Sequence, residues 1–276
     1  MAKKKPESNN FRVKKYFGQN FLSDSFVISK IISSANISKD TVVLEIGPGK
    51  GALTKGLLKV SKKVIAYEVD NEVIPILKEN TKPYTNLEII NEDILKTDLT
   101  YLNDYSEEVI TVSNLPYYIT SPIIDLFFKK LTKLNKAIFM VQKEVADRLN
   151  AKVGTKDYNA FTILVQYKST VKKLIDVDRT SFKPAPNVDS AVIEIVKIER
   201  ELKANNDKFF ERVVKSSFSE RRKTLVNNLT RDLKISKDCV VSVLDDLSLR
   251  ADIRAENLSI DDFINLTNKL EVNYEH

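Results

Sequence analysis

Short apolar runs that alternate with helix-patterned segments constrain the fold of residues 24–142 more than any other feature of the sequence. The apolar runs lie at 42–46, 64–68, 87–90, 109–113 and 136–142, and helical patterns lie at 27–32, 53–60, 73–80 and 123–131. Continuously apolar runs of this length are typical of strands that are buried on both faces of a sheet. Because parallel neighbours need crossover connections, the alternation predicts a mostly parallel, Rossmann-like α/β sheet with helices on both faces.

The pattern changes after residue 158. A helical pattern at 161–167 precedes two strand-like runs, 171–177 and 188–196, which are joined by a proline-containing connection. We expect these runs to form an antiparallel pair that completes the sheet. From about residue 203 onward the pattern is helical. The sequence therefore predicts one domain over residues 1–200 and a small C-terminal all-helical domain over 201–276.

Glycine is scarce in this chain, and its placement indicates a ligand-binding loop. Three of the six glycines lie in Glu45–Gly51, which follows the first predicted strand and opens a helix. Glycines let the backbone pass close to a ligand at the carboxyl edge of a sheet. The segment lacks the Gly-Lys-Ser/Thr ending of a P-loop and the usual dinucleotide spacing. With an acid before the loop, this version suits S-adenosylmethionine, a cofactor without phosphate.

Polar residues also lie at the carboxyl ends of the second, third and fourth predicted strands. Glu68 ends the second strand, where a carboxylate can hold both hydroxyls of a ribose, although an ordinary solvated acid is an alternative. Asp93 follows the third strand, where it could accept a hydrogen bond from an adenine amino group, and Asn114 follows the fourth. Ligands of open α/β sheets bind along this edge, so we interpret these positions as one cofactor site.

The tetrapeptide Asn114-Leu115-Pro116-Tyr117 combines two acceptors with one aromatic ring. The side-chain oxygen of Asn114 and the carbonyl of Leu115 can each accept a hydrogen bond from an amino group. Pro116 has no N–H and fixes its own φ, while the ring of Tyr117 can stack on a flat ligand. Methylation of a nucleobase amine requires this set of groups. Taken alone, the tetrapeptide could also be a turn.

Composition excludes several classes of protein. The chain has one cysteine, Cys239, and one histidine, His276, so an internal disulfide, a zinc site and a histidine relay are not expected. We expect no metal. No apolar stretch approaches the roughly 18 residues of a membrane span, and no signal peptide is evident, so we expect a cytoplasmic protein. The net charge of +6 is uneven, with a basic arm before residue 20 that suits a polyanion or is a solubilising tail.

Five segments together resemble the ribosomal RNA adenine dimethyltransferase family, and most of all its bacterial small-subunit enzymes. They are Tyr16–Leu22, Glu45–Gly51, Asn114–Tyr117, Phe182–Ala191 and Arg221–Leu225, and the resemblance extends from about residue 12 to 265. It implies a class I methyltransferase fold and S-adenosylmethionine as cofactor. The implied reaction is dimethylation of the exocyclic amine of adenines, expected to be two adjacent ones, in small-subunit ribosomal RNA during ribosome biogenesis.

The resemblance also implies roles for individual residues. Cofactor contacts are expected at Asn20, Leu22, Gly47, Gly49, Glu68, Asp93 and Asn114. The target adenine is expected at Asn114, Leu115, Pro116 and Tyr117, with Phe182 as a second aromatic wall or, alternatively, a core residue. RNA binding is expected from Arg12, Lys14, Lys15, Arg221, Arg222 and Lys223, although the last three could instead form a solvated helix face. The first predicted domain would then bind the cofactor, and the second would recognise RNA.

Three alternative functions remain at this point. A DNA adenine methyltransferase typically carries Pro at the position of Leu115. The large-subunit enzyme that confers macrolide resistance is a closer alternative, and residues 187–191 and 221–225 argue against it. A ribosome-assembly factor could bind without catalysing, although the complete set of cofactor positions argues against binding alone. The expected partner is ribosomal RNA in the 30S particle or its precursor, bound by a monomer.

Overall fold

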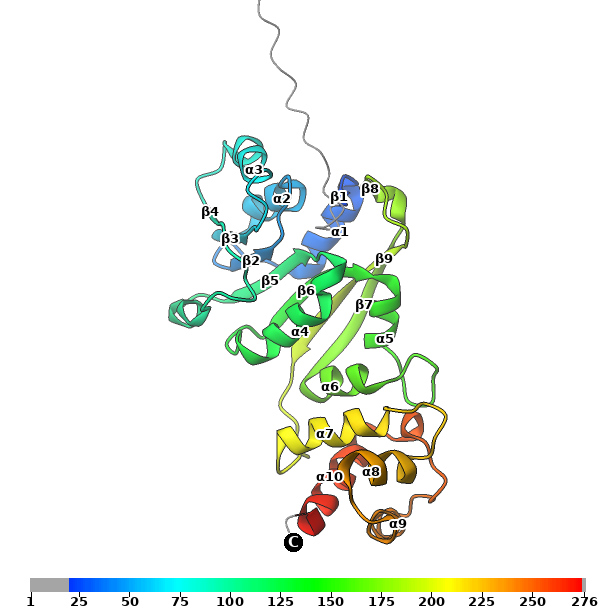
Figure 1. Ribbon diagram of the computed structural model, residues 1–276. Helices are drawn as coiled ribbons and strands as arrows, with labels where there is room; N and C mark the ends of the chain where they lie inside the picture. The colour runs from blue at the N-terminus through cyan, green and yellow to red at the C-terminus, as the bar shows by residue number, and fades with distance from the viewer. Residues whose placement is uncertain (1–19, 275–276) are drawn as a thin grey trace, which may run out of the picture. The chain divides into compact units, whose positions relative to one another are not determined.

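The computed structural model describes residues 20–274, which pack into two compact units (Figure 1). The first unit contains the chain up to Gln142 together with Leu174–Val192. The second contains Lys143–Lys173 together with the chain from Ile193 onward. No helix among the described residues is long and apolar enough to cross a membrane.

A mostly parallel sheet of seven strands carries the fold, as predicted. Its order is β4 (Leu87–Ile90), β3 (Lys63–Tyr67), β2 (Val42–Ile46), β5 (Val109–Asn114), β6 (Lys136–Gln142), β9 (Ser190–Lys197) and β7 (Ser169–Val177). The first five of these pair in parallel, and the predicted antiparallel strands complete the sheet. Strands β2 and β5 are buried almost throughout, which explains their mostly apolar sequences.

Helices connect the strands of the first unit. They are α1 (Ser25–Ala35), α2 (Ala52–Val60), α3 (Ile74–Thr81) and α4 (Thr120–Lys129), with short 3₁₀ turns at η2 (Thr100–Asp104), η3 (Tyr117–Ile119) and η4 (Arg179–Ser181). Asp24 caps the start of α1, because one of its carboxylate oxygens accepts from the N–H groups of Phe26 and Val27. One apolar core joins α1 and α2 to the sheet through residues such as Leu57 and Val64.

A two-stranded ladder near the start of the described chain was not predicted. Strand β1 (Phe21–Leu22) pairs antiparallel with β8 (Phe182–Lys183), so that Leu22 lies opposite Phe182 (Figure 1). Two segments that the sequence analysis assigned separately to the cofactor and to the target base are thereby joined by backbone hydrogen bonds. Neither strand is long enough to give a periodic signal in the sequence.

The second unit is helical and has a core of its own. It contains α5 (Lys143–Leu149), α6 (Ala160–Lys168), α7 (Asp207–Ser217), α8 (Leu225–Leu233), α9 (Lys237–Asp246), the turn η5 (Ala255–Asn257) and α10 (Ile260–Tyr274). Its buried core includes Ile163, Phe210, Leu229 and Phe263. This packing differs from the division predicted at residue 200, because the apolar side chains of α6 join the core of the C-terminal helices. The functional division into a cofactor domain and an RNA-recognition domain stays a prediction.

Candidate active site

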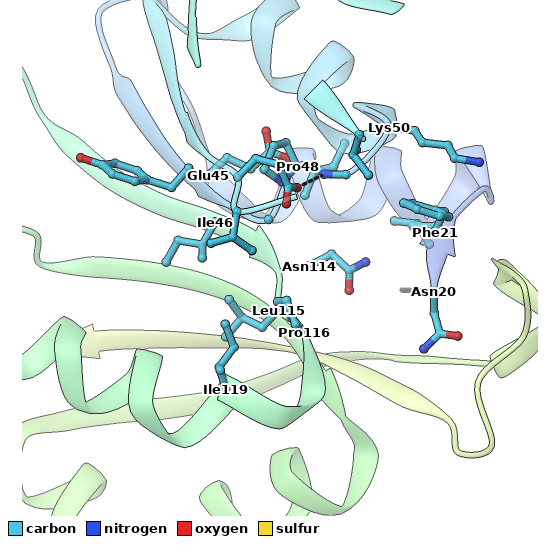
Figure 2. Close-up of a pocket in the computed structure, with 18 of the residues that line it drawn as sticks. Asn20, Phe21, Glu45, Ile46, Pro48, Lys50, Asn114, Leu115, Pro116 and Ile119 are labelled. Atoms are coloured by element: carbon cyan, nitrogen blue, oxygen red, sulfur yellow. Dashed lines mark hydrogen bonds between the residues drawn. The ribbon is translucent and has the colours of Figure 1, made fainter. Parts of the chain in front are cut away.

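A pocket of about 660 Å³ lies in the first unit, where residues that follow β2, β3, β4 and β5 meet. A pocket of this size suits a cofactor-sized ligand. Figure 2 shows Glu45 and Pro48 on one side of it, Asn114 near its centre and Asn20 across from them. Every predicted catalytic and cofactor-binding residue lines this pocket: Asn20, Leu22, Gly47, Gly49, Glu68, Asp93, Asn114, Leu115, Pro116, Tyr117 and Phe182. The structure thus brings the set together, and the role of each member stays a prediction.

The glycine loop after β2 needs backbone that side chains would not allow. Gly49 has a φ of +56°, and a Cβ there would lie 3.1 Å from the ring of Phe21. Gly51 has a φ of +85° at the start of α2, and a Cβ there would lie 2.7 Å from Leu77 Cδ1. Glycine is therefore required at both positions, because L residues are strained at these φ angles and the space is filled.

Glu68 ties the glycine loop to the end of β3. One of its carboxylate oxygens accepts from the Gly49 N–H at 3.1 Å and the other from the Asp70 N–H at 2.9 Å. Burial raises the pKa of Glu68, and these two backbone donors oppose that rise. Each oxygen keeps a further lone pair, so the carboxylate can still accept hydrogen bonds from a ligand.

Glu45 is a site residue to which the sequence analysis assigned no role of its own. It is the last residue but one of β2 and lines the pocket with 1% of its surface exposed, and its Oε2 has no hydrogen-bond partner among the described residues. Burial, with the nearby charge of Glu68, raises the pKa of Glu45 to about 8. An ionised carboxyl here is costly unless a donor or a cation reaches it. The signal in the sequence was an acid inside an otherwise apolar strand.

The backbone of the Asn114–Tyr117 segment is held to the neighbouring strand β6. The Leu115 N–H donates to the Met140 carbonyl at 3.1 Å, and Leu115 is 1% exposed. Asn114 is the last residue of β5, and among the described residues neither its side-chain amide nor the Leu115 carbonyl has a hydrogen-bond partner. Two acceptors beside the pocket are therefore available to a ligand (Figure 2).

The glycine loop and the Asn114–Tyr117 segment also contact each other. The Ile46 N–H donates to Ser113 Oγ at 2.8 Å, immediately before Asn114. A Cβ on Gly47 would lie 3.5 Å from the ring of Pro116, so the two loops already pack closely. These contacts fix the position of one loop relative to the other, which a reaction between two bound molecules requires.

Asp93 and Asn20 also line the pocket. Asp93 follows β4, and its Oδ1 accepts from the Leu95 N–H at 3.1 Å. The neighbouring Asn91 donates its side-chain amide to the Glu68 carbonyl at 2.8 Å, which joins the ends of β3 and β4. Phe182 is 2% exposed, as a core residue would be, and it still lines the pocket.

A basic turn lies between α7 and α8 in the second unit. Arg221, Arg222 and Lys223 are exposed there and, with Glu220, line a hollow of about 510 Å³. The alternative in which these three residues form a solvated helix face is wrong, because they lie in a turn between two helices. The turn is braced from inside, because the buried Asn228 amide donates to the Ser217 and Glu220 carbonyls at 2.7 and 3.1 Å.

The predicted RNA-binding residues Arg12, Lys14 and Lys15 lie outside the described residues. Within residues 20–274 no group of histidine, cysteine, aspartate or glutamate side chains is arranged to hold a metal ion.

Comparison with known proteins places this arrangement in context. The family model described as ribosomal RNA adenine dimethylase matches residues 10–271. The chain is 45% identical to ribosomal RNA small subunit methyltransferase A of Geobacillus kaustophilus, over 96% of this chain and 93% of that protein.

Two solved structures are similar over nearly their whole length. A dimethyladenosine transferase from Plasmodium falciparum superposes with a TM-score of 0.78 at 31% identity, covering 92% of this chain and 97% of that one. The 23S rRNA methyltransferase ErmE superposes with a TM-score of 0.71 at 27% identity, covering 91% of this chain and all of that one.

The buried carboxyl of Glu45 makes a prediction about stability. The unfolded chain releases this proton near pH 4.5 and the folded protein near 8, so the free energy of unfolding should fall as pH rises through that window. Glu45→Gln removes the ionisation. Without ligand, the variant should therefore gain stability over the wild type between pH 4.5 and 8, by on the order of a few kcal/mol at the upper end.

Urea unfolding at several pH values measures this difference. Glu79→Gln is a matched control, because Glu79 is exposed on α3. A stability difference between Glu45→Gln and the wild type that does not change with pH would contradict the buried, raised-pKa carboxyl.

Proposed function

The chain belongs to the ribosomal RNA adenine dimethylase family, and we propose that the pocket beside β2, β3, β4 and β5 is where its reaction takes place. The reaction is the S-adenosylmethionine-dependent dimethylation of the exocyclic amine of adenines in small-subunit ribosomal RNA. The observation that carries the proposal is the pair of acceptors at Asn114 and Leu115, which have no partner among the described residues and lie in the same pocket as Glu68 and the glycine loop.

The residues of the pocket fit S-adenosylmethionine. We assign Glu68 to the ribose hydroxyls and Asp93 to the adenine amine, with the Gly47–Gly51 backbone and the Asn20–Leu22 segment against the remainder of the cofactor. Glu45 offers a buried carboxyl whose Oε2 has no hydrogen-bond partner in the described chain. Such a carboxyl suits the ammonium group on the amino-acid part of the cofactor. When bound, the cofactor supplies an electrophilic methyl group on a positively charged sulfur.

Asn114 and Leu115 act on the target amine. The lone pair of an adenine amine is delocalised into the ring, so the amine is a weak nucleophile. Two acceptors that hold its hydrogens favour the pyramidal form and stabilise the positive charge that develops during transfer. Correct placement of two reactants can by itself contribute roughly 7–11 kcal/mol to lowering a barrier. No residue needs to remove a proton early, which agrees with a sequence whose only histidine is His276.

Aromatic residues receive the base. The adenine must leave its stack to reach the pocket, which costs a few kcal/mol. Stacking on Tyr117, with Phe182 as a second wall, offsets roughly 1–3 kcal/mol per ring. Because Phe182 is almost fully buried, its contribution would come from the part of the ring that lines the pocket.

The identity of the relatives favours the small subunit as the source of the adenine. The chain is 45% identical to the small-subunit methyltransferase of Geobacillus kaustophilus and 27% identical to the 23S rRNA methyltransferase ErmE. The large-subunit alternative is therefore not favoured. A factor that only binds is also not favoured, because the family model describes a dimethylase and the similar curated proteins are named methyltransferases.

The wider setting of the reaction is part of the proposal. Ribosomal RNA is the substrate, and we place it in the 30S particle or its precursor, met by a monomer in the cytoplasm. The exposed bases Arg221, Arg222 and Lys223 would contact RNA phosphates. The acidic stretch at residues 238–262 would face away from the RNA.

Asn114→Ala removes one of the two acceptors for the amine. Loss of one positioned hydrogen-bonding group typically lowers kcat by about 10²–10³-fold, so methyl transfer to unmodified small subunits should fall at least this much. Binding of the particle should change little. Tritium transfer from labelled cofactor measures the rate, and Asn150→Ala, at an exposed position after α5, is the control. Comparable turnover by the variant would rule out the acceptor role.

Glu68→Ala tests the cofactor site. Loss of hydrogen bonds from a charged acceptor costs about 1.5–3 kcal/mol, so the Kd for S-adenosylmethionine should rise roughly 10- to 100-fold. Titration calorimetry measures this change directly, with Glu79→Ala as the exposed control. If the two variants bind the cofactor equally well, Glu68 does not hold the ribose.

Arg222→Ala tests the basic turn, because this exposed side chain lines the hollow between α7 and α8. Removal of one phosphate contact should weaken binding to the small subunit and reduce the slope of log K against log salt concentration by about 1. Lys237→Ala, an exposed change at the start of α9, should leave the slope unaltered. If the two variants show equal slopes of log K against log salt concentration, Arg222 does not contact RNA phosphates.

A further inference from the structure

The hydroxyl of Tyr117 is not needed for stacking, because a phenylalanine ring offers the same face to a base. Tyr117 is partly buried, and burial raises the pKa of its hydroxyl, so the group stays neutral. A buried hydroxyl without a partner destabilises a protein by about 1–3 kcal/mol. The presence of tyrosine here therefore points to a partner that makes use of the hydroxyl.

Ser190 is that partner. Its Oγ lies 2.7 Å from the Tyr117 hydroxyl oxygen, across 73 residues of sequence, and either group can be the donor. Ser190 is the first residue of β9 and has no exposed surface. Within the described chain this is the only hydrogen bond that either side chain makes. The bond is short and well shielded, so it holds the far edge of the Tyr117 ring in place.

The backbone on either side of Ser190 is itself held. β9 lies inside the sheet between β6 and β7. Before it, the Arg179 guanidinium donates to Asp189 Oδ1 and to the Asn187 carbonyl, each at 3.2 Å, and the Arg179 N–H also donates to Asp189 Oδ1. One exposed ion pair stabilises little, but three bonds from one residue close the connection between β8 and β9.

This connection begins at the pocket and ends at a residue that holds one of the pocket's aromatic side chains. Its first end is Phe182 in β8, which lines the pocket and is fixed opposite Leu22 by the β1–β8 ladder. Its second end is Ser190, which holds Tyr117. A single stretch of chain therefore sets the position of both aromatic residues that we assign to the target base.

We infer that Ser190 is a positioning residue for methyl transfer, which fixes the Tyr117 ring and so the plane against which the adenine stacks. The inference rests on the proposed role of Asn114–Tyr117 as the target site. Without the bond, the ring can turn about its side-chain torsions, and the amine is no longer aimed at the methyl group. A misplacement of about 1 Å can cost a reaction about 10²-fold.

The second methyl transfer should depend on this bond more than the first. An unmodified adenine amine has two hydrogens, one for Asn114 and one for the Leu115 carbonyl. After the first transfer one hydrogen remains, so the two acceptors can no longer both be satisfied. Stacking must then supply a larger share of the orientation, and a loosened Tyr117 should favour release of the monomethylated product.

The test compares Ser190→Ala, Tyr117→Phe and the double variant on unmodified small subunits, with kcat, KM and the ratio of mono- to dimethyladenosine as readouts. Each single variant should lower kcat about 10-fold and raise the monomethyl share, with the Kd for S-adenosylmethionine within about twofold of the wild type. The double variant should be no worse than either single one, because both remove the same bond. Effects that multiply in the double variant, or an unchanged rate and product ratio, would overturn the inference.

Controls separate positioning from stability. Ser61→Ala removes another buried hydroxyl, whose partner is the Leu57 carbonyl, and should leave the product ratio unchanged. A smaller folded fraction lowers the total rate but not that ratio. If Ser190→Ala does not fold, Tyr117→Phe alone tests the inference, because this variant loses the hydroxyl that bonds Ser190 and keeps the aromatic ring. Asn114→Ala tests the proposed target site itself, and turnover by this variant would contradict that site. If Asn114→Ala is inactive and Tyr117→Phe behaves as the wild type, the site stands and only the positioning role of Ser190 is wrong.

Discussion

Parallel pairing of β2 with β3 and β5 is the constraint on which the site depends. Ile46 lies opposite Tyr67 and Tyr67 opposite Ile90, so β2, β3 and β4 end at the same level of the sheet. The residues after those ends, and Asn114 at the end of β5, then reach one pocket. An antiparallel arrangement would alternate strand ends between two edges and would separate these groups. The chemistry of the site is therefore a consequence of strand direction.

Buried carboxyl groups make this pocket suited to a ligand that carries donors or positive charge. Glu45 and Glu68 are both desolvated, and each has a raised pKa. Only Glu68 has backbone donors to offset its burial, while Glu45 Oε2 has none among the described residues. A sulfonium cofactor with an ammonium group and two ribose hydroxyls meets these needs. Under the proposed function, some stability of the ligand-free protein is given up for binding, as is common at functional sites.

Hydrogen bonds between distant segments do much of the positioning. Ser113 joins the glycine loop to the end of β5, Ser190 holds Tyr117, and Asn228 holds the turn that carries the exposed bases. All three are small polar side chains that are almost fully buried. Their positions are set by the sheet or by a helix, so the groups that would touch cofactor, adenine and phosphate are held by rigid parts of the fold.

The sequence by itself indicated a mostly parallel sheet, a helical C-terminal region and a set of candidate site residues, all of which line one pocket. It could do so because buried strands, glycine loops and helix caps leave local patterns that need only neighbouring residues to be recognised. Tertiary structure decided the rest. Residues far apart in the chain form the β1–β8 ladder and the bond between Tyr117 and Ser190, and they group α6 with the C-terminal helices. They also decide that Glu45 Oε2 has no hydrogen-bond partner among the described residues. Such contacts form only when the folded chain closes long loops, and a linear pattern carries no record of which distant partners then meet.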